Sequence, residues 1–169
     1  MVNCLKYAHT TAVPQEFLAE IGRVVATFAL LEWELIQLIH LLLGTERNVS
    51  RILTSELPFR GLQDVSMALV KEVFGDEEAR KYREVLKLVS GAEEERNVVS
   101  HSLWGLGVSK GKNVVIRTKF TAKRKRGLSL QREELAVDDL QSSVSRISVA
   151  IHELQVFRDT LGLGKPEWI

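Results

Sequence analysis

Three side chains near the middle of the chain have the chemistry to act on a phosphodiester. They lie in the segment Arg96-Asn97-Val98-Val99-Ser100-His101. A histidine, with an ordinary pKa of about 6.5, can accept or donate a proton at neutral pH, and an arginine can stabilise charge on a phosphate without a metal. Asn97 would share a helix face with His101. These residue types are the minimum equipment for attack of an RNA 2′-hydroxyl on the adjacent phosphate. DNA lacks that hydroxyl.

The spacing of Arg96 and His101 limits this interpretation. Residues five apart on a regular helix point about 140° away from each other, so the two side chains are not natural neighbours. A helix distortion near His101, or pairing with a second subunit, could bring them to one cleft. A two-fold dimer would place two copies of each residue around a shared groove. The residues by themselves leave both routes open.

Glu32 and Arg96 fall on helix faces where a charge is expensive. At 100° per residue, Glu32 lies about 40° from Phe28 in an apolar stripe, and Arg96 lies about 40° from Ala92 in another. An isolated buried charge is costly, whereas a hydrogen-bonded carboxylate and guanidinium share the desolvation penalty. We therefore expect Glu32 to face Arg96 and to orient it. The alternative is a pair of long side chains whose charged ends reach solvent at the edge of the bundle.

Apolar residues at spacings of three and four predict that most of the chain is helical. Gly44 ends the first long helix, and Asp138 caps the last one. Pro58 separates two shorter helical stretches, because proline disfavours helix at the residue before it. The expected helices cover about 14–43, 46–56, 62–75, 76–99 and 138–162.

Before the last helix the hydrophobic period changes to that of a strand. Residues 114–121 are rich in β-branched types and follow a turn at 109–113, so we predict an inserted β-hairpin over about 103–121. Together these elements predict one domain over residues 1–169. Its fold class is mainly α, an elongated helical bundle with a small β-hairpin before the last long helix.

The hairpin and the loop after it are basic. From Lys110 to Arg126 there is no acidic residue. Such a run could hold an RNA backbone. It could also be a solvated, solubilising hairpin, or it could meet an acidic protein surface. The candidate RNA-binding residues are Lys110, Lys112, Arg117, Lys119, Lys123, Arg124, Lys125 and Arg126.

Composition excludes several classes of protein. The 169 residues are 45% hydrophobic and 27% charged, which fits a compact domain, and a net charge of +1 excludes a uniformly basic nucleic-acid binder. Cys4 is the single cysteine, so intramolecular disulfides are excluded and a cytoplasmic location is expected. The spacings of zinc ligands are missing, so we expect no metal or cofactor. The apolar stretch 24–43 contains two glutamates and a histidine, so we expect a core helix and no membrane.

The segment Arg96–His101 resembles the motif of the HEPN family of helical-bundle ribonucleases and toxins. That motif is an arginine, four to six further residues and a histidine, commonly with an asparagine directly after the arginine. Here the match is Arg96, Asn97 and His101. Three features of the context agree with the resemblance: the motif lies late on a helix, a glutamate lies in the apolar stripe of the long first helix, and a Leu-Pro-Phe step precedes another helix. The likeness in layout covers about residues 17–160, and six residues carry the specific chemistry.

The resemblance implies a function and partners. Arg96 and His101 would be the catalytic pair of a metal-independent endoribonuclease, with Asn97 as a polar support. Family members typically form homodimers with the motif at the interface. Many are toxins of toxin–antitoxin or antiviral defence systems and are often paired with a nucleotidyltransferase-like antitoxin. The basic hairpin departs from the family pattern. Because many HEPN domains are inactive, the alternative is a non-catalytic module for dimerisation and for binding protein or nucleic acid.

Overall fold

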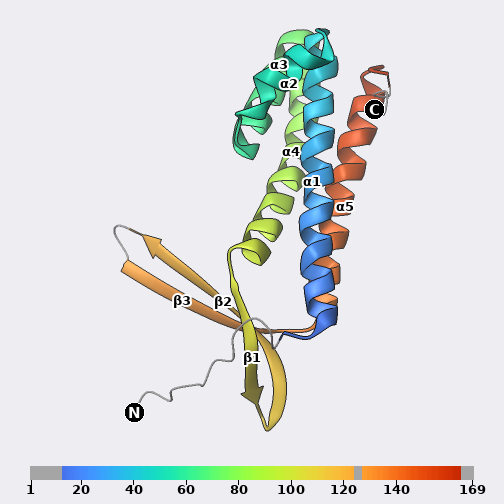
Figure 1. Ribbon diagram of the computed structural model, residues 1–169. Helices are drawn as coiled ribbons and strands as arrows, with labels where there is room; N and C mark the ends of the chain where they lie inside the picture. The colour runs from blue at the N-terminus through green and yellow to red at the C-terminus, as the bar shows by residue number, and fades with distance from the viewer. Residues whose placement is uncertain (1–12, 124–126, 165–169) are drawn as a thin grey trace. The chain divides into compact units, whose positions relative to one another are not determined.

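The computed structural model describes residues 13–123 and 127–164, and over these residues the fold is mainly helical with one small antiparallel sheet (Figure 1). The predicted order of the helices is confirmed, and their boundaries agree to within a few residues. The elements in chain order are α1 (Gln15–Leu43), α2 (Arg47–Ser55), α3 (Phe59–Phe74), α4 (Asp76–Ser100), β1 (Leu103–Ser109), β2 (Lys112–Lys123), β3 (Gly127–Leu135) and α5 (Val137–Thr160).

The chain forms two compact units. The first unit contains the described part of Met1–Val25 together with Glu94–Val144, which includes the sheet and the end of α4. The second unit contains Ala26–Glu93 and the described part of Ser145–Ile169. The three long helices α1, α4 and α5 each contribute residues to both units. The expectation of a single domain over residues 1–169 stays a prediction.

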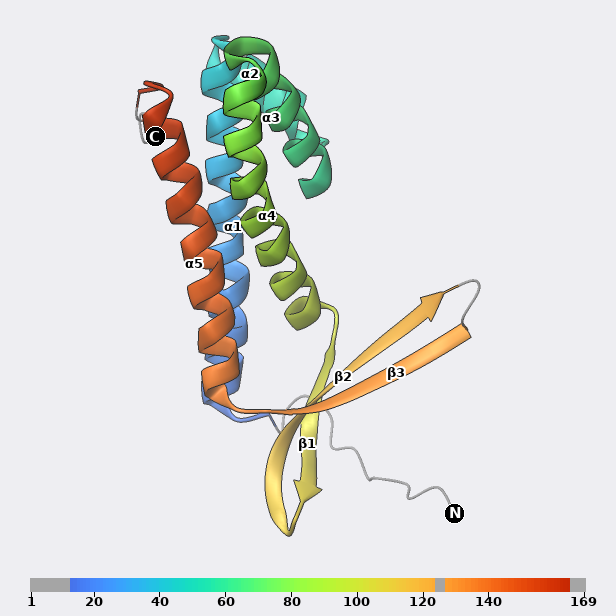
Figure 2. The same cartoon turned by 180° about the vertical axis from the view of Figure 1, so that it is seen from behind.

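The second unit has a helical core. Figures 1 and 2 show α2 and α3 beside the parts of α1 and α4 that belong to this unit. The rings of Phe28 and Phe59 lie 4.7 Å apart between α1 and α3, and those of Tyr82 and Phe157 stack at 4.8 Å between α4 and α5. The fully buried side chains of this unit include Leu31, Leu35, Leu38, Ile39, Leu62, Val70, Tyr82, Val89, Ile147 and Leu154.

Among the described residues, α1 is the helix whose length and apolar composition would allow it to cross a membrane. However, Leu31, Leu35 and Leu38 have no exposed surface, because protein covers them. Burial of these positions is the pattern of a core helix, as expected from the sequence. The cytoplasmic location stays a prediction.

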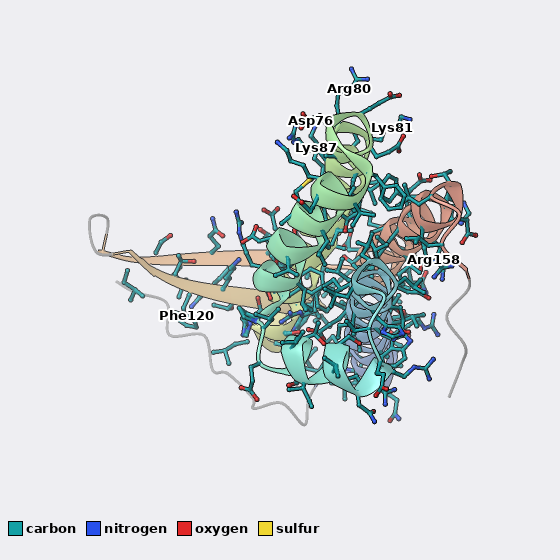
Figure 3. The ribbon with its side chains drawn as sticks, turned by 90° about the horizontal axis from the view of Figure 1, so that it is seen from above. Asp76, Arg80, Lys81, Lys87, Phe120 and Arg158 are labelled. Carbon is teal, nitrogen blue, oxygen red and sulfur yellow. The ribbon has the colours of Figure 1, made fainter. Side chains whose placement is uncertain are left out.

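Glu34 of α1 and Arg158 of α5 form a buried ion pair. Figure 3 labels Arg158 on its helix. Nη1 of Arg158 donates to Oε2 of Glu34 at 3.0 Å, and the two residues are 6% and 2% exposed. Nε2 of Gln155 donates to the other carboxylate oxygen at 2.7 Å, while Nε and Nη2 of Arg158 each donate to Oδ1 of Asp159 at 3.2 Å. Both oxygens of the buried carboxylate therefore have donors, which is the condition under which a buried charge is tolerated.

The strongly buried carboxylate of this stretch of α1 is Glu34, not the predicted Glu32, which is half-buried. Glu32 is predicted from one apolar stripe of α1, which is centred on Phe28. That stripe is buried, but α1 also buries the side that faces α5, and Glu34 lies there. The partner, Arg158, is 124 residues away in the chain. Helical periodicity within α1 carries no information about that partner.

The sheet has three strands in the order β1-β2-β3, so the predicted two-stranded hairpin is incomplete. β1 pairs with β2 so that Leu103 lies opposite Thr118 at one end and Ser109 lies opposite Lys112 at the other. β2 pairs with β3 so that Val115 lies opposite Leu135 at one end and Lys123 lies opposite Gly127 at the other. Figure 2 shows the long β2 pairing first with β1 and then with β3. Eight of the nine residues of β3 are exposed. A strand exposed on both faces lacks the buried apolar face from which strands are predicted, so sequence analysis missed it.

We predict that breaking the Glu34–Arg158 pair destabilises the protein strongly. Arg158→Met leaves the Glu34 carboxylate buried without its main partner, and we expect the free energy of unfolding to fall by about 3–5 kcal/mol. The control is Lys87→Met, because Lys87 pairs with Glu84 on the surface, and we expect a loss below about 1 kcal/mol. Urea unfolding measures both changes.

The double variant Glu34→Leu/Arg158→Leu tests the cause of that loss. It removes both charges, so we expect it to recover most of the stability. A double variant as unstable as Arg158→Met would show that packing, rather than the unpaired carboxylate, causes the loss.

Tyr82 provides a prediction on pH. Burial raises the pKa of its phenol. The hydroxyl also donates a hydrogen bond to Oγ of Ser66 at 2.8 Å. Because the pKa is higher in the folded chain, this group contributes stability below the unfolded value of about 10, and the contribution is lost as pH rises above it. We expect Tyr82→Phe to lose stability less steeply than the wild type above this pH. Parallel slopes in urea titrations at alkaline pH would contradict this.

Candidate functional site

The end of α4 positions the three motif residues. Arg96 and Asn97 lie on the helix and are half-buried, and His101 is exposed in the turn directly after the helix ends at Ser100. The backbone N–H of His101 still donates to the carbonyl oxygen of Asn97 at 3.1 Å. The helical hydrogen-bond pattern thus continues through His101, so Asn97 and His101 lie on the same side of this last turn.

Two further hydrogen bonds fix the turn that carries His101. Oγ of Ser102 donates to the carbonyl oxygen of Val98 at 2.6 Å, and Nε1 of Trp104 donates to that of Val99 at 3.1 Å. The last carbonyls of a helix lack partners within the helix, so side chains that follow it often bind them. Here the following residues do so, and they hold the backbone on both sides of His101. The imidazole itself is exposed to solvent.

Polar contacts also join the elements of the first unit near the motif. Oγ of Ser143, on α5, donates to Oε2 of Glu95 at 2.7 Å, and Ser143 is 5% exposed. On α1, Oε1 of Glu20 lies 3.2 Å from Nη1 of Arg23 and 3.4 Å from Nε2 of Gln141. Glu20, Glu95 and Ser143 are not predicted from the sequence. A helical wheel can show that Glu20 is a charge near apolar neighbours. It cannot show that Ser143 of α5 contacts α4, because that contact joins residues far apart in the chain.

The expected pairing of Glu32 with Arg96 stays a prediction. Arg96 belongs to the first compact unit and Glu32 to the second, and each unit is described by itself. Within the first unit, the carboxylate on α1 that is buried is Glu20, at 6% exposure. Its Oε2 atom has no hydrogen-bond partner among the described residues.

The candidate RNA-binding residues of β2 whose side chains the structure describes lie on both faces of the sheet. Cross-strand partners share a face, so the register places Arg117 and Lys119 on one face and Phe120 on the other, as expected for a strand. Lys112 lies on the face of Phe120, and Lys110 lies in the turn between β1 and β2. The side chain of Lys123 and the residues Arg124, Lys125 and Arg126 lie outside the described residues.

The missed strand β3 changes the charge around these residues. Glu133 lies directly opposite Arg117 and forms an ion pair with it. Glu134 is the next residue of the same strand. The segment that is purely basic in sequence is therefore partly neutralised in the sheet. Among the described members of the basic set, Lys110, Lys112 and Lys119 carry charges to which the structure assigns no ion pair.

The described residues contain no group of three or more histidine, cysteine or acidic side chains that could hold a metal ion. The motif residues at the end of α4 provide an imidazole, a guanidinium and an amide. These groups can exchange a proton, stabilise a negative charge and donate hydrogen bonds.

No protein-family model, no curated protein and no solved structure matches this chain. The resemblance to the HEPN family therefore rests on the motif and its place in the chain.

We predict that Trp104→Phe weakens the turn around His101. The variant keeps most of the ring surface but removes the hydrogen bond to Val99, so we expect a loss of about 1 kcal/mol in the free energy of unfolding. We also expect faster amide hydrogen exchange at His101 by NMR, because its N–H lies in the last helical turn. Unchanged exchange at His101 would mean that the indole does not hold this turn.

Proposed function

We propose that this protein is a metal-independent endoribonuclease that cleaves RNA by attack of a 2′-hydroxyl on the adjacent phosphate. The observation that supports this proposal best is the arrangement at the end of α4: an exposed His101 on a backbone held by three hydrogen bonds, one helical turn after the half-buried Arg96 and Asn97. A fixed backbone around an accessible imidazole is the arrangement that proton transfer to a bound ligand requires.

In this mechanism the imidazole of His101 accepts the proton of the 2′-hydroxyl. The 2′-oxygen forms a bond to phosphorus, and the bond from phosphorus to the 5′-oxygen breaks. The leaving 5′-oxygen takes up a proton from an imidazolium, so the products are a 2′,3′-cyclic phosphate and a 5′-hydroxyl. Arg96 stabilises the charge on the phosphate oxygens in the transition state, and Asn97 positions the phosphate by hydrogen bonding.

Two routes can bring Arg96 and His101 to one phosphate: a distortion of the helix near His101, or pairing with a second subunit. The continued helical hydrogen bond at His101 keeps the two side chains about 140° apart on the helix, as in a regular turn. This favours the second route, in which a two-fold dimer supplies Arg96 from one subunit and His101 from the other. The RNA substrate would enter the groove between them, with support from the exposed Lys110 and Lys112.

The resemblance to HEPN toxins extends the proposal to a biological role. On this proposal the protein is a toxin of a bacterial toxin–antitoxin or antiviral defence system, and a nucleotidyltransferase-like antitoxin would restrain it. Induced expression should then slow growth, and His101→Ala should relieve the effect at equal protein level. Equal toxicity of the wild type and His101→Ala would overturn the toxin role. The ribonuclease activity is tested separately by cleavage.

A cleavage assay with purified protein in EDTA tests the activity. We expect His101→Ala to lower the rate about 10²–10⁴-fold and Arg96→Ala to lower it about 10²–10³-fold. The matched controls are His152→Ala and Arg83→Ala, because both side chains are exposed and belong to the second unit, whereas the motif belongs to the first. Substituting 2′-deoxynucleotides should abolish cleavage.

The second candidate function is a non-catalytic binding module. The observation that favours it is the exposure of large apolar side chains on the sheet, with Leu103, Phe120 and Leu128 between 50% and 72% exposed. The same assay separates the two functions. A folded wild-type protein that cleaves none of several RNAs, or that cleaves equally well without His101, would overturn the ribonuclease and leave the binding module.

A further inference from the structure

One end of the sheet exposes apolar side chains on a single face. Phe120 of β2 lies directly opposite Leu130 of β3, so both side chains lie on one face, and Leu128 is two residues from Leu130 on that same face. Their exposed fractions are 50%, 45% and 72%. We name Phe120, Leu128 and Leu130 the apolar end of the sheet; Figure 3 labels Phe120 on its strand. Exposed apolar patches of this kind mark interaction sites.

The strand β3 also has an open edge beside these side chains. Among the described residues, β3 is hydrogen-bonded to a neighbouring strand on one side only, where β2 lies. Proteins usually protect such an edge with charges, proline or a bulge. The half Gly127–Gln131 of β3 has no charged residue and no proline, whereas the half Arg132–Leu135 has three charged residues. The uncharged half is therefore the part of the edge that can accept another strand.

We propose that the uncharged half of β3 pairs antiparallel with the same segment of a second copy of this chain, which joins the two three-stranded sheets into one of six strands. The two-fold axis passes through Ser129. This inference does not depend on the proposed ribonuclease activity.

The sequence of β3 selects this axis because it is self-complementary there. With the axis at Ser129, Leu128 lies opposite the partner's Leu130, and Leu130 lies opposite the partner's Leu128. Because Phe120 already lies opposite Leu130, an apolar row runs across the joined sheets from Phe120 through Leu130 to the partner's Leu128. The symmetry repeats this row once. Apolar cross-strand pairs of this kind stabilise sheets.

Other positions of the axis are less favourable. An axis at Gln131 places Leu130 opposite the partner's Arg132. An axis at Leu130 places Leu128 opposite the partner's Arg132. Axes at Arg132 and at Glu133 place each of these charges opposite its own copy, which is destabilising. A shift by one residue would move the leucines to the other face of the sheet. The register centred on Ser129 therefore gives both leucines an apolar neighbour.

The other outer strand, β1, fits a second copy less well. Five of its seven residues are half-buried, whereas eight of the nine residues of β3 are exposed. The paired segment of β3 is short, so the area that it buries is small compared with the roughly 1,200 Å² or more of interfaces in stable complexes. We therefore expect a dimer whose population rises with protein concentration.

Cysteine cross-linking tests the axis. In a Cys4→Ser background, Ser129→Cys places two thiols opposite each other at the axis, within the Cα separation of about 4.4–6.8 Å that a disulfide needs. The matched control is Gln131→Cys, two residues along the same exposed face, where the two copies would lie about 14 Å apart. We expect a disulfide-linked dimer from Ser129→Cys and none from Gln131→Cys. Equal linking of both, or none at Ser129→Cys, would overturn the register.

Light scattering against concentration tests the surface without cysteines. We expect the wild type to dimerise and Leu130→Lys to lose the dimer, because the new charge would face the partner's Leu128. The control is Leu103→Lys, a 62% exposed leucine on the same face but on β1, which should dimerise as the wild type does. Circular dichroism confirms folding of each variant. A monomeric wild type, or a dimer that Leu130→Lys leaves intact, would overturn the proposal.

Discussion

The second unit depends on how its buried polar groups are satisfied, above all the carboxylate of Glu34. Around this residue α1 is covered on most sides, so any polar group there needs a partner from a neighbouring helix. Arg158 and Gln155 of α5 supply donors to both carboxylate oxygens. Such contacts are strongly directional, whereas apolar packing tolerates small shifts, so they restrict how α5 slides along α1. The same need explains the hydrogen bond from Tyr82 to Ser66.

In the first unit the corresponding constraint is the carboxyl end of α4. A helix that ends beside a sheet leaves carbonyl groups that need donors. Ser102 and Trp104 provide two of them, and both residues lie at or next to the start of β1. The transition from helix to strand is therefore closed by the residues that follow it. His101 lies within this transition, which gives an exposed imidazole a fixed backbone without burying the ring.

The charged side chains of β3 and its exposed leucines lie in different halves of the strand. Glu133 binds Arg117 and lowers the local positive charge, while Leu128 and Leu130 extend the apolar end with Phe120. One strand thus weakens the case for a continuous basic surface and supplies an open edge. If both proposals hold, a dimer joined through β3 carries two copies of the motif.

Periodicity within the sequence determined the helices, their order and the strand character of β2, because local spacing encodes which side of an element is apolar. It also determined that Asn97 and His101 share a side of the last turn of α4. Only the tertiary structure decided that Glu34 rather than Glu32 is the strongly buried acid, because its partner Arg158 lies 124 residues away. The same holds for β3 and the Arg117–Glu133 pair, since a strand exposed on both faces leaves no apolar period, and pairing across strands depends on register rather than on neighbours in the chain.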